Sequence, residues 1–300
     1  MKIKYHNPVL LKEVLQGLRI QPKGIYVDVT YGGGGHSRGI IDLLSKEGRL
    51  FGFDQDTDVL KNLIDDRRFE FFPANFSHLN QYLKYNNVKS VDGILADLGV
   101  SSYQFDKGSR GFSIRNNGRL DMRMNQSQIL DAHQVLNKYS EDSLSQLFFS
   151  YGELRNSKKI AKLIVNRRVN SVIQTTQDLI SLVRPLIPQR FENKFLAKLF
   201  QAIRIEVNDE LRVLKVFLKQ AAKVLNPGGR LVCISYHSIE DRIVKRYFQN
   251  GNFEGKQEKD FYGNLITPLK KVGKLKVPSK DEIDTNSRAR SAKLRIAEKR

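Results

Sequence analysis

The chain has 300 residues, of which 40% are hydrophobic, with one cysteine and a formal net charge of +19. This length allows one large core or two domains. A single cysteine excludes an internal disulfide and a cysteine-built zinc site. No apolar run approaches the roughly 20 residues that span a bilayer. The N-terminus also lacks the apolar stretch of a secretory signal, so we expect a cytoplasmic protein without a membrane partner.

The first third of the chain alternates predicted strands and helices. A helix is expected after the four glycines at 32–35, and another over 57–64 with Thr57 as its N-cap. Strands that alternate with helices form βαβ units, which predicts a mostly parallel sheet covered on both faces. The four expected strands are 24–30, 49–54, 69–72 and 91–98.

The pattern changes over the next hundred residues, where apolar positions recur at helical spacing and no convincing strand is found. Thr175 and Asp178 fit a capping box that opens one of these helices, and Pro185 and Pro188 close it. The central part of the chain is therefore predicted to be helical.

A long helix is expected over 193–225, with a break near Asn208, and the Pro-Gly-Gly sequence at 227–229 ends it. The strand pattern then returns. The last three expected strands are 230–236, 265–272 and 292–297.

Far more residues separate the strands at 91–98 and 230–236 than one crossover helix needs. We therefore predict a core domain formed by 1–105 and 200–300, with a helical subdomain inserted at 106–199. Two sequential domains are the alternative, and the return of the strand pattern argues against them.

Four consecutive glycines stand between a predicted strand and a predicted helix, from Gly32 onward. Glycines let the backbone approach a ligand closely, and the helix start offers free N–H groups to an anion. Asp54 follows Gly34 by twenty positions, where a carboxylate binds ribose hydroxyls. Ser37 stands where the strict dinucleotide pattern needs glycine, and no P-loop sequence is present, so S-adenosyl-L-methionine is favoured.

Seven unusual motifs are spread along the whole chain. They are HNPVLL at 6–11, GGGGHS at 32–37, DGILADLGVSS at 92–102, GFS at 111–113, LDMRM at 120–124, FQAIR at 200–204 and SYHSIEDR at 235–242. On these motifs the chain resembles the RsmH (MraW) family of bacterial 16S rRNA cytosine-N4 methyltransferases, and the match extends to SRARS at 287–291.

The resemblance implies an α/β fold of the class I S-adenosylmethionine methyltransferase type, Rossmann-like, with an inserted all-helical subdomain. It also implies a target cytosine in the decoding centre of 16S rRNA in the small ribosomal subunit. Tyr236 departs from the family, in which many members have Phe. The family's cofactor contacts carry over to Gly34, Gly35, His36, Asp54, Phe76, Asp97 and Gln104.

The exocyclic amine of cytosine is a poor nucleophile, so its position in line with the methyl group matters most. Asp97, at a predicted strand end, is the best candidate to bind cofactor, polarise the amine, or both. Ser101, Ser102 and His237 are weaker candidates. His237 is predicted either to contact the base or take up the released proton, or to make only a structural hydrogen bond.

Cys233 lies in the middle of a predicted strand and is expected to be inert, which argues against the thiolate chemistry of cytosine-C5 methylation. A non-catalytic rRNA-binding or ribosome-assembly factor is the main alternative function. DNA methylation is disfavoured because the Asn/Asp-Pro-Pro-aromatic motif is absent. The scattered histidines form no recognisable metal-ligand set, so no metal site is predicted, while metal dependence and the choice between monomer and homodimer stay open.

The basic residues form two clusters that are expected to contact rRNA phosphates, although a generally basic surface is the alternative. Another charged segment, with Arg110, Arg115, Asp121 and Arg123, is expected to fold over the target base. The clusters are Arg155, Lys158, Lys159, Lys162, Arg167 and Arg168, and, near the C-terminus, Lys270, Lys271, Lys274, Lys276, Lys280, Arg288, Arg290, Lys293, Arg295, Lys299 and Arg300.

Overall fold

The computed structural model of the chain describes residues 8–300, so His6 and Asn7 of the first motif lie outside the described residues. The chain forms two compact units. The core unit comprises Met1–Gly99 and Leu211–Arg300, and the inserted unit comprises Val100–Glu210. These bounds differ from the expected 106–199, because Val100 and the helix residues up to Val207 pack into the apolar core of the inserted unit.

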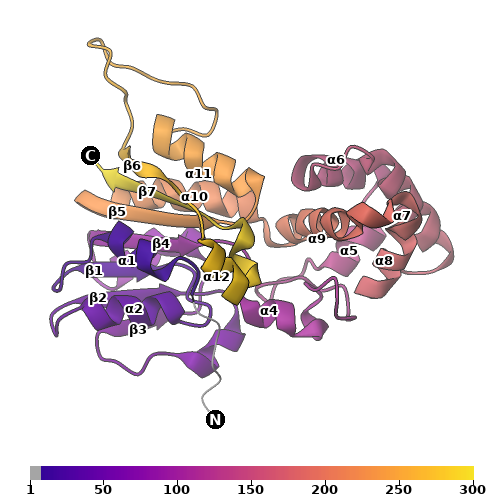
Figure 1. Cartoon of the computed structure of the whole chain (residues 1–300), viewed down its shortest axis with the longest axis horizontal. Coiled ribbons are helices and arrows are strands. Elements are labelled where there is room, and N and C mark those ends of the chain that lie inside the picture. Colours follow the sequence, from indigo (N-terminus) through magenta and orange to yellow (C-terminus); the bar gives the residue numbers. More distant parts are fainter. Residues whose placement is uncertain (1–7) are drawn as a thin grey trace. The chain divides into compact units, whose positions relative to one another are not determined.

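The core unit contains a seven-stranded sheet with the order β3-β2-β1-β4-β5-β7-β6 (Figure 1). Strands β1 to β5 are parallel, whereas β7 runs antiparallel to both β5 and β6. This order, with an antiparallel β7, is the class I methyltransferase arrangement. The strands are β1 Ile25–Asp28, β2 Arg49–Phe53, β3 Phe69–Phe72, β4 Val91–Asp97, β5 Leu225–Ser235, β6 Leu269–Lys276 and β7 Lys293–Lys299.

Helices cover both faces of the sheet, because the central strands are apolar on both sides. In β4, Ile94 belongs to one apolar cluster and Leu95 to the other, and both side chains are fully buried. Such near-continuous apolar strands are typical of buried parallel sheets. The helices of this unit are α1 Leu11–Leu18, α2 Gly35–Leu43, α3 Leu79–Tyr85, α10 Glu210–Val224, α11 Ser238–Asn250 and α12 Lys280–Thr285.

The register brings the polar ends of neighbouring strands to one edge of the sheet. Asp28 is opposite Gly52 of β2 and Leu95 of β4, and Asp97 is opposite Ile234 of β5. Ligands of such sheets bind at the carboxyl ends of the strands, so this edge positions the candidate site.

Three local expectations for the core unit were wrong. The segment expected as a helix at 57–64 is a 3₁₀ helix, Thr57–Asn62, and Asp56 rather than Thr57 caps it by accepting from the Asp58 N–H. Strand β5 begins at Leu225 instead of 230, since Leu225 pairs with Val91 before the register shifts. Strand β6 begins four residues later than expected.

The inserted unit is helical, and its described residues add only an isolated bridge between Arg119 and Thr175. The expected capping box at Thr175 and Asp178 is confirmed. The helices are α4 Ser102–Asp106, α5 Ala132–Lys138, α6 Glu141–Gly152, α7 Ser157–Asn170, α8 Thr176–Val183 and α9 Glu192–Asn208.

The expected break near Asn208 is also confirmed. Helix α9 ends there, and Asp209 has φ of 51° before the next helix begins at Glu210. The Asn208 amide donates to the carbonyls of Met122 and Arg204, so it helps to fix this end of the helix. Among the described helices, none is long and apolar enough to cross a membrane.

Candidate cofactor and active site

The glycine turn follows β1 and leads into α2. Gly32 and Gly34 have φ of 51° and 72°, which L side chains rarely adopt. Helix α2 starts at Gly35, and within the described chain no side chain caps it. Its first-turn N–H groups therefore remain available to an anionic group, as the sequence predicted.

Asp54, directly after β2, holds this turn from the neighbouring strand. Its carboxylate accepts from the N–H of Gly32 at 2.8 Å and from that of Asp56 at 2.9 Å. Burial raises the pKa of Asp54 to about 6. The side chain is nevertheless partly exposed and has acceptor capacity left for a hydroxyl group.

Asp28 braces the turn from inside. Its buried carboxylate accepts from the Ser37 hydroxyl at 2.7 Å and from the Thr30 N–H at 3.1 Å. Thr30 in turn accepts from the Asp97 N–H at 2.7 Å. Burial raises the pKa of Asp28, and the facing His36 opposes that shift. These contacts make Asp28 a structural link between β1, α2 and β4.

Asp97 ends β4, with 22% of its side chain exposed. One carboxylate oxygen accepts from the Tyr236 hydroxyl at 2.8 Å, and the other lies 3.7 Å from His36 Nδ1. Burial raises the pKa of Asp97 to about 6, while His36 and the Tyr236 hydrogen bond act in the opposite direction. Burial and the nearby Asp97 charge raise the pKa of Tyr236 well above its usual value, so its hydroxyl stays a donor.

His36 bridges two parts of the core unit through both ring nitrogens. Its Nε2 lies 2.9 Å from the carbonyl oxygen of Val9, and because a carbonyl only accepts, Nε2 carries the hydrogen. Nδ1 then faces Asp97. The side chain is buried, so the motif residue Val9 orients His36 toward Asp97.

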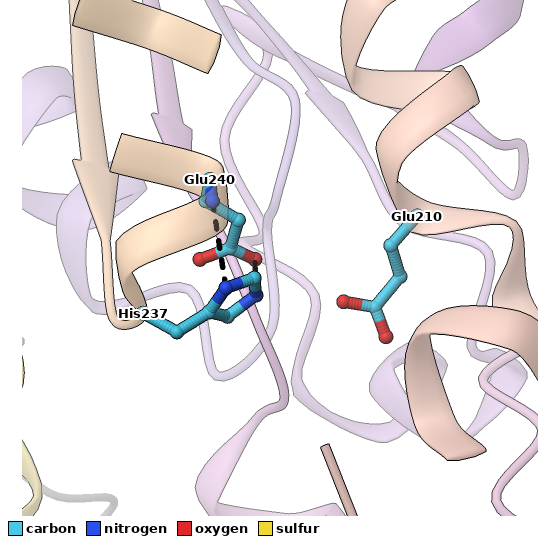
Figure 2. Close-up of side chains that lie close together, drawn as sticks. All are labelled: Glu210, His237 and Glu240. Carbon is cyan, nitrogen blue, oxygen red and sulfur yellow. Dashed lines mark hydrogen bonds and ion pairs between the residues drawn. The ribbon is translucent and has the colours of Figure 1, made fainter. Parts of the chain in front are cut away.

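His237 caps α11 by accepting a hydrogen bond from the Glu240 N–H, and its ring also lies beside the Glu240 carboxylate (Figure 2). Its Nδ1 accepts from the Glu240 N–H at 3.4 Å, and its Nε2 lies 3.0 Å from the Glu240 carboxylate. The other carboxylate oxygen accepts from the Tyr236 N–H at 3.1 Å. Glu210, also drawn in Figure 2, is the first residue of α10 and the last residue of the inserted unit, and it pairs with Arg204 at 2.8 Å.

Two participants were missed by sequence reasoning. Glu240 follows His237 by three positions, the spacing of a capping box, and this signal was available in the sequence. The role of Tyr236 was hidden, because a Tyr in place of the family's Phe gives no sign of the partner of its hydroxyl.

Phe76 and Gln104 are the two remaining residues of the expected cofactor set. Phe76 is half-buried, and its ring packs edge-on against Phe217 with centroids 5.2 Å apart. Gln104 lies in the inserted unit, where it and Ser101 cap α4 reciprocally. Ser101 is therefore a helix cap.

Cys233 is buried in the middle of β5, opposite Arg295 of β7. Burial raises the pKa of its thiol. Because the thiolate is the nucleophile, a buried neutral thiol cannot start a covalent attack on cytosine.

Three of the four charged residues that were expected to fold over the target base, Arg110, Asp121 and Arg123, make contacts within the inserted unit. Arg123 makes a two-pronged ion pair with Asp121, at 2.9 and 2.7 Å. The buried Arg110 donates to the carbonyls of Arg123 and Met124. These contacts stabilise the loop that precedes α5.

Helix α7 carries the first basic cluster except for Arg155, which precedes the helix. It has no acidic residue, and its side chains at Lys158, Lys159, Lys162 and Arg167 are exposed. Arg168 is half-buried and donates to the Leu136 carbonyl. The inserted unit thus has several exposed cations on this helix.

Known proteins resemble the chain over nearly its full length. A family profile described as the MraW methylase family matches residues 4–300. Ribosomal RNA small subunit methyltransferase H of Christiangramia forsetii is 54% identical over 297 residues, which cover 99% of this chain and 98% of that protein. The protein of the same name from Bacteroides fragilis is 52% identical over 297 residues, with the same coverage.

A solved structure described as a putative rRNA-methylase from Clostridium thermocellum has a TM-score of 0.44 and 12% identity, covering 99% of this chain and all of that one. The full-length profile match and the relatives above 50% identity decide the assignment. The chain belongs to the MraW methylase family.

Proposed function

We propose that this chain transfers the methyl group of S-adenosyl-L-methionine to the N4 amine of a cytosine in the rRNA of the small ribosomal subunit, at the decoding centre. The observation that carries the proposal is the Asp97 carboxylate at the end of β4, held by Tyr236 and facing His36. The names of the relatives above 50% identity support the substrate class.

The residues around the glycine turn fit the cofactor. The uncapped start of α2, at Gly35, suits the carboxylate of its methionine part. Asp54 is partly exposed, and hydrogen bonds from ribose hydroxyls would stabilise its ionised form. Phe76 has an exposed part for the adenine ring. When bound, S-adenosyl-L-methionine supplies an electrophilic methyl group.

Asp97 acts on the nucleophile. Its partly exposed carboxylate accepts a hydrogen bond from the cytosine amine and thereby holds the nitrogen in one orientation. With a pKa of about 6, most of the Asp97 population is ionised at pH 7 and able to accept. Tyr236 keeps the carboxylate in place. His237 is the second catalytic candidate, and its contacts favour action through Glu240 and Tyr236.

The inserted unit, we propose, recognises the substrate. The exposed cations of α7 contact rRNA phosphates, which give affinity without sequence information. The basic C-terminal residues add to this electrostatic attraction. The reaction takes place in the cytoplasm, where ribosomal subunits assemble.

Mass spectrometry of small-subunit rRNA from cells with and without the gene tests the function. One N4-methylated cytosine should disappear without the gene. Purified wild-type protein with S-adenosyl-L-methionine should restore it on isolated subunits, and Asp97→Ala should not. An unchanged modification pattern would refute the proposal and favour a non-catalytic RNA-binding factor.

A further inference from the structure

A long excursion of the chain joins α11 to β6 (Figure 1). It carries two aromatic side chains that are almost fully exposed. Phe261 is 97% exposed and Tyr262 is 85% exposed, and their rings meet edge to face with centroids 5.6 Å apart. Ile266 nearby is 57% exposed. An edge-to-face pair leaves ring faces open, so this tip presents flat apolar surfaces for a partner.

The tip is held by a defined network of hydrogen bonds. Asp260 accepts from the N–H groups of Tyr262 and Asn264 at 2.9 and 2.8 Å, and from the Asn264 side chain at 3.1 Å. Lys259 and Leu265 form an antiparallel bridge below it. The aromatic rings are therefore presented on a closed turn.

The base of the excursion is anchored on the core unit. The Phe253 ring stacks on Tyr247 with centroids 4.9 Å apart. Lys215 and Lys219 of α10 place their ammonium groups 5.7 and 5.6 Å from the centre of the Phe253 ring. Two cations of α10 therefore lie beside Phe253, at the base of the excursion.

The surrounding chain favours a polyanion. Residues 245–276 contain eight basic and three acidic side chains. One of the three acids, Asp260, accepts hydrogen bonds from backbone N–H groups of the turn. Lys270, Lys271 and Lys274 are exposed on β6, which is an edge strand of the sheet. Exposed aromatic rings beside cations are the combination with which proteins bind single-stranded nucleic acid.

We propose that Phe261 and Tyr262, here called the aromatic tip, stack on unpaired bases of the substrate rRNA while the flanking lysines contact its phosphates. The inference rests on the proposed function, and it adds a contact outside the Asp97 site. Stacking on an aromatic ring tolerates any base, so the tip contributes affinity rather than choice of the target cytosine.

Steady-state kinetics of the full chain on isolated small subunits tests the contribution of the tip. The double variant Phe261→Ala/Tyr262→Ala should raise KM for the subunit at least about tenfold. KM for S-adenosyl-L-methionine and kcat should stay within about twofold, since neither residue belongs to the Asp97 network. Tyr85→Ala is the matched control, because this Tyr is also 85% exposed and lies on α3. It should leave both KM values unchanged.

Fluorescence identifies the partner, because the chain has no tryptophan and Phe261→Trp places a single reporter at the tip. Protein-free single-stranded segments of the rRNA should quench its emission, whereas duplex RNA should not. Quenching by intact subunits alone would assign the tip to a ribosomal protein and overturn the proposal.

The proposed function and the tip fail in distinguishable ways. If the wild type methylates subunits and the double variant does so with an unchanged KM, the tip proposal is refuted and the function stands. If the wild type has no activity, the function is refuted. The quenching experiment still decides whether the tip binds RNA, because it needs no turnover.

Discussion

At the scale of single residues, Asp97 combines contacts that oppose one another. Burial favours its neutral form, while the Tyr236 hydroxyl and the facing His36 favour the ionised form. Two further acids that face it, Asp28 and Glu240, again favour the neutral form. The result is a carboxylate whose pKa of about 6 lies near neutral pH, where a general acid or base works best.

This balance predicts the pH dependence. With saturating S-adenosyl-L-methionine, kcat/KM for the subunit should fall as pH drops through about 6, because protonated Asp97 accepts more weakly from the amine than the carboxylate does. Asp97→Asn should lower kcat/KM by about 10²-fold or more at pH 7.5.

Tyr236→Phe removes a hydrogen bond that lowers the pKa of Asp97. The acid limb of the pH profile of this variant should therefore move to higher pH. An acid limb in Tyr236→Phe that coincides with the wild type would contradict this role.

Cys233 gives a prediction of the opposite kind. Cys233→Ala should keep kcat within about twofold, since the thiol is buried and neutral. It should lower the free energy of unfolding by about 1 kcal/mol, because a small buried side chain is lost. Methylation assays and urea unfolding measure the two quantities. Loss of activity in a folded Cys233→Ala variant would contradict this prediction and support covalent attack by the thiol on the cytosine.

The sequence revealed the acidic side chains of the site more readily than their partners. Asp54 and Asp97 come at the ends of strands whose apolar patterns are plain in the sequence, so both could be predicted as site residues. The hydroxyl of Tyr236 reaches Asp97 across 139 positions of sequence. No local pattern encodes such a contact, because it depends on the register of β4 and β5.

At the scale of elements, the turn from β5 into α11 links capping to the site. His237 caps the helix, Glu240 accepts from the Tyr236 N–H, and Tyr236 donates to Asp97. The cap is thus connected to the carboxylate through three residues in one turn.

This connection predicts different outcomes for two substitutions. His237→Ala should lower the free energy of unfolding by about 1 kcal/mol and reduce kcat, because the helix start loses its cap. His237→Asn restores an acceptor for the Glu240 N–H, so stability and most of kcat should return. Urea unfolding and methylation assays make the comparison. If the Asn variant is stable but inactive, His237 acts in proton transfer and its role is not limited to capping the helix.

The elements themselves differ in how far the sequence determined them. The first four strands were expected within two residues of their observed ends, since each is a short apolar run beside turn residues. The early start of β5 was missed, because Pro227 and two glycines indicate a loop. Tertiary pairing of Leu225 with Val91 overrides that local preference.

At the scale of the whole molecule, positive charge dominates, with 51 basic and 32 acidic residues. In the inserted unit this charge is concentrated on α7, where exposed cations have no acidic neighbour on the same helix. Such a surface binds a polyanion with an affinity that depends on salt.

The charge of α7 can be tested as a group. Lys158→Ala/Lys159→Ala/Arg167→Ala should weaken binding to the small subunit and reduce the slope of log Kd against log salt by about two to three. Filter binding across a salt series provides the slope. The intact core unit should still bind S-adenosyl-L-methionine with unchanged affinity. An unchanged slope would exclude phosphate contacts by this helix.

The discontinuous core unit has a consequence for synthesis. Strand β5 pairs with β4 in the finished sheet, yet the ribosome must first make all of the inserted unit. At about 5–20 residues per second, the edge of β4 waits roughly ten seconds for its neighbour. An open apolar edge invites pairing with other chains. Newly made protein therefore passes through an aggregation-prone stage, and slower translation prolongs it.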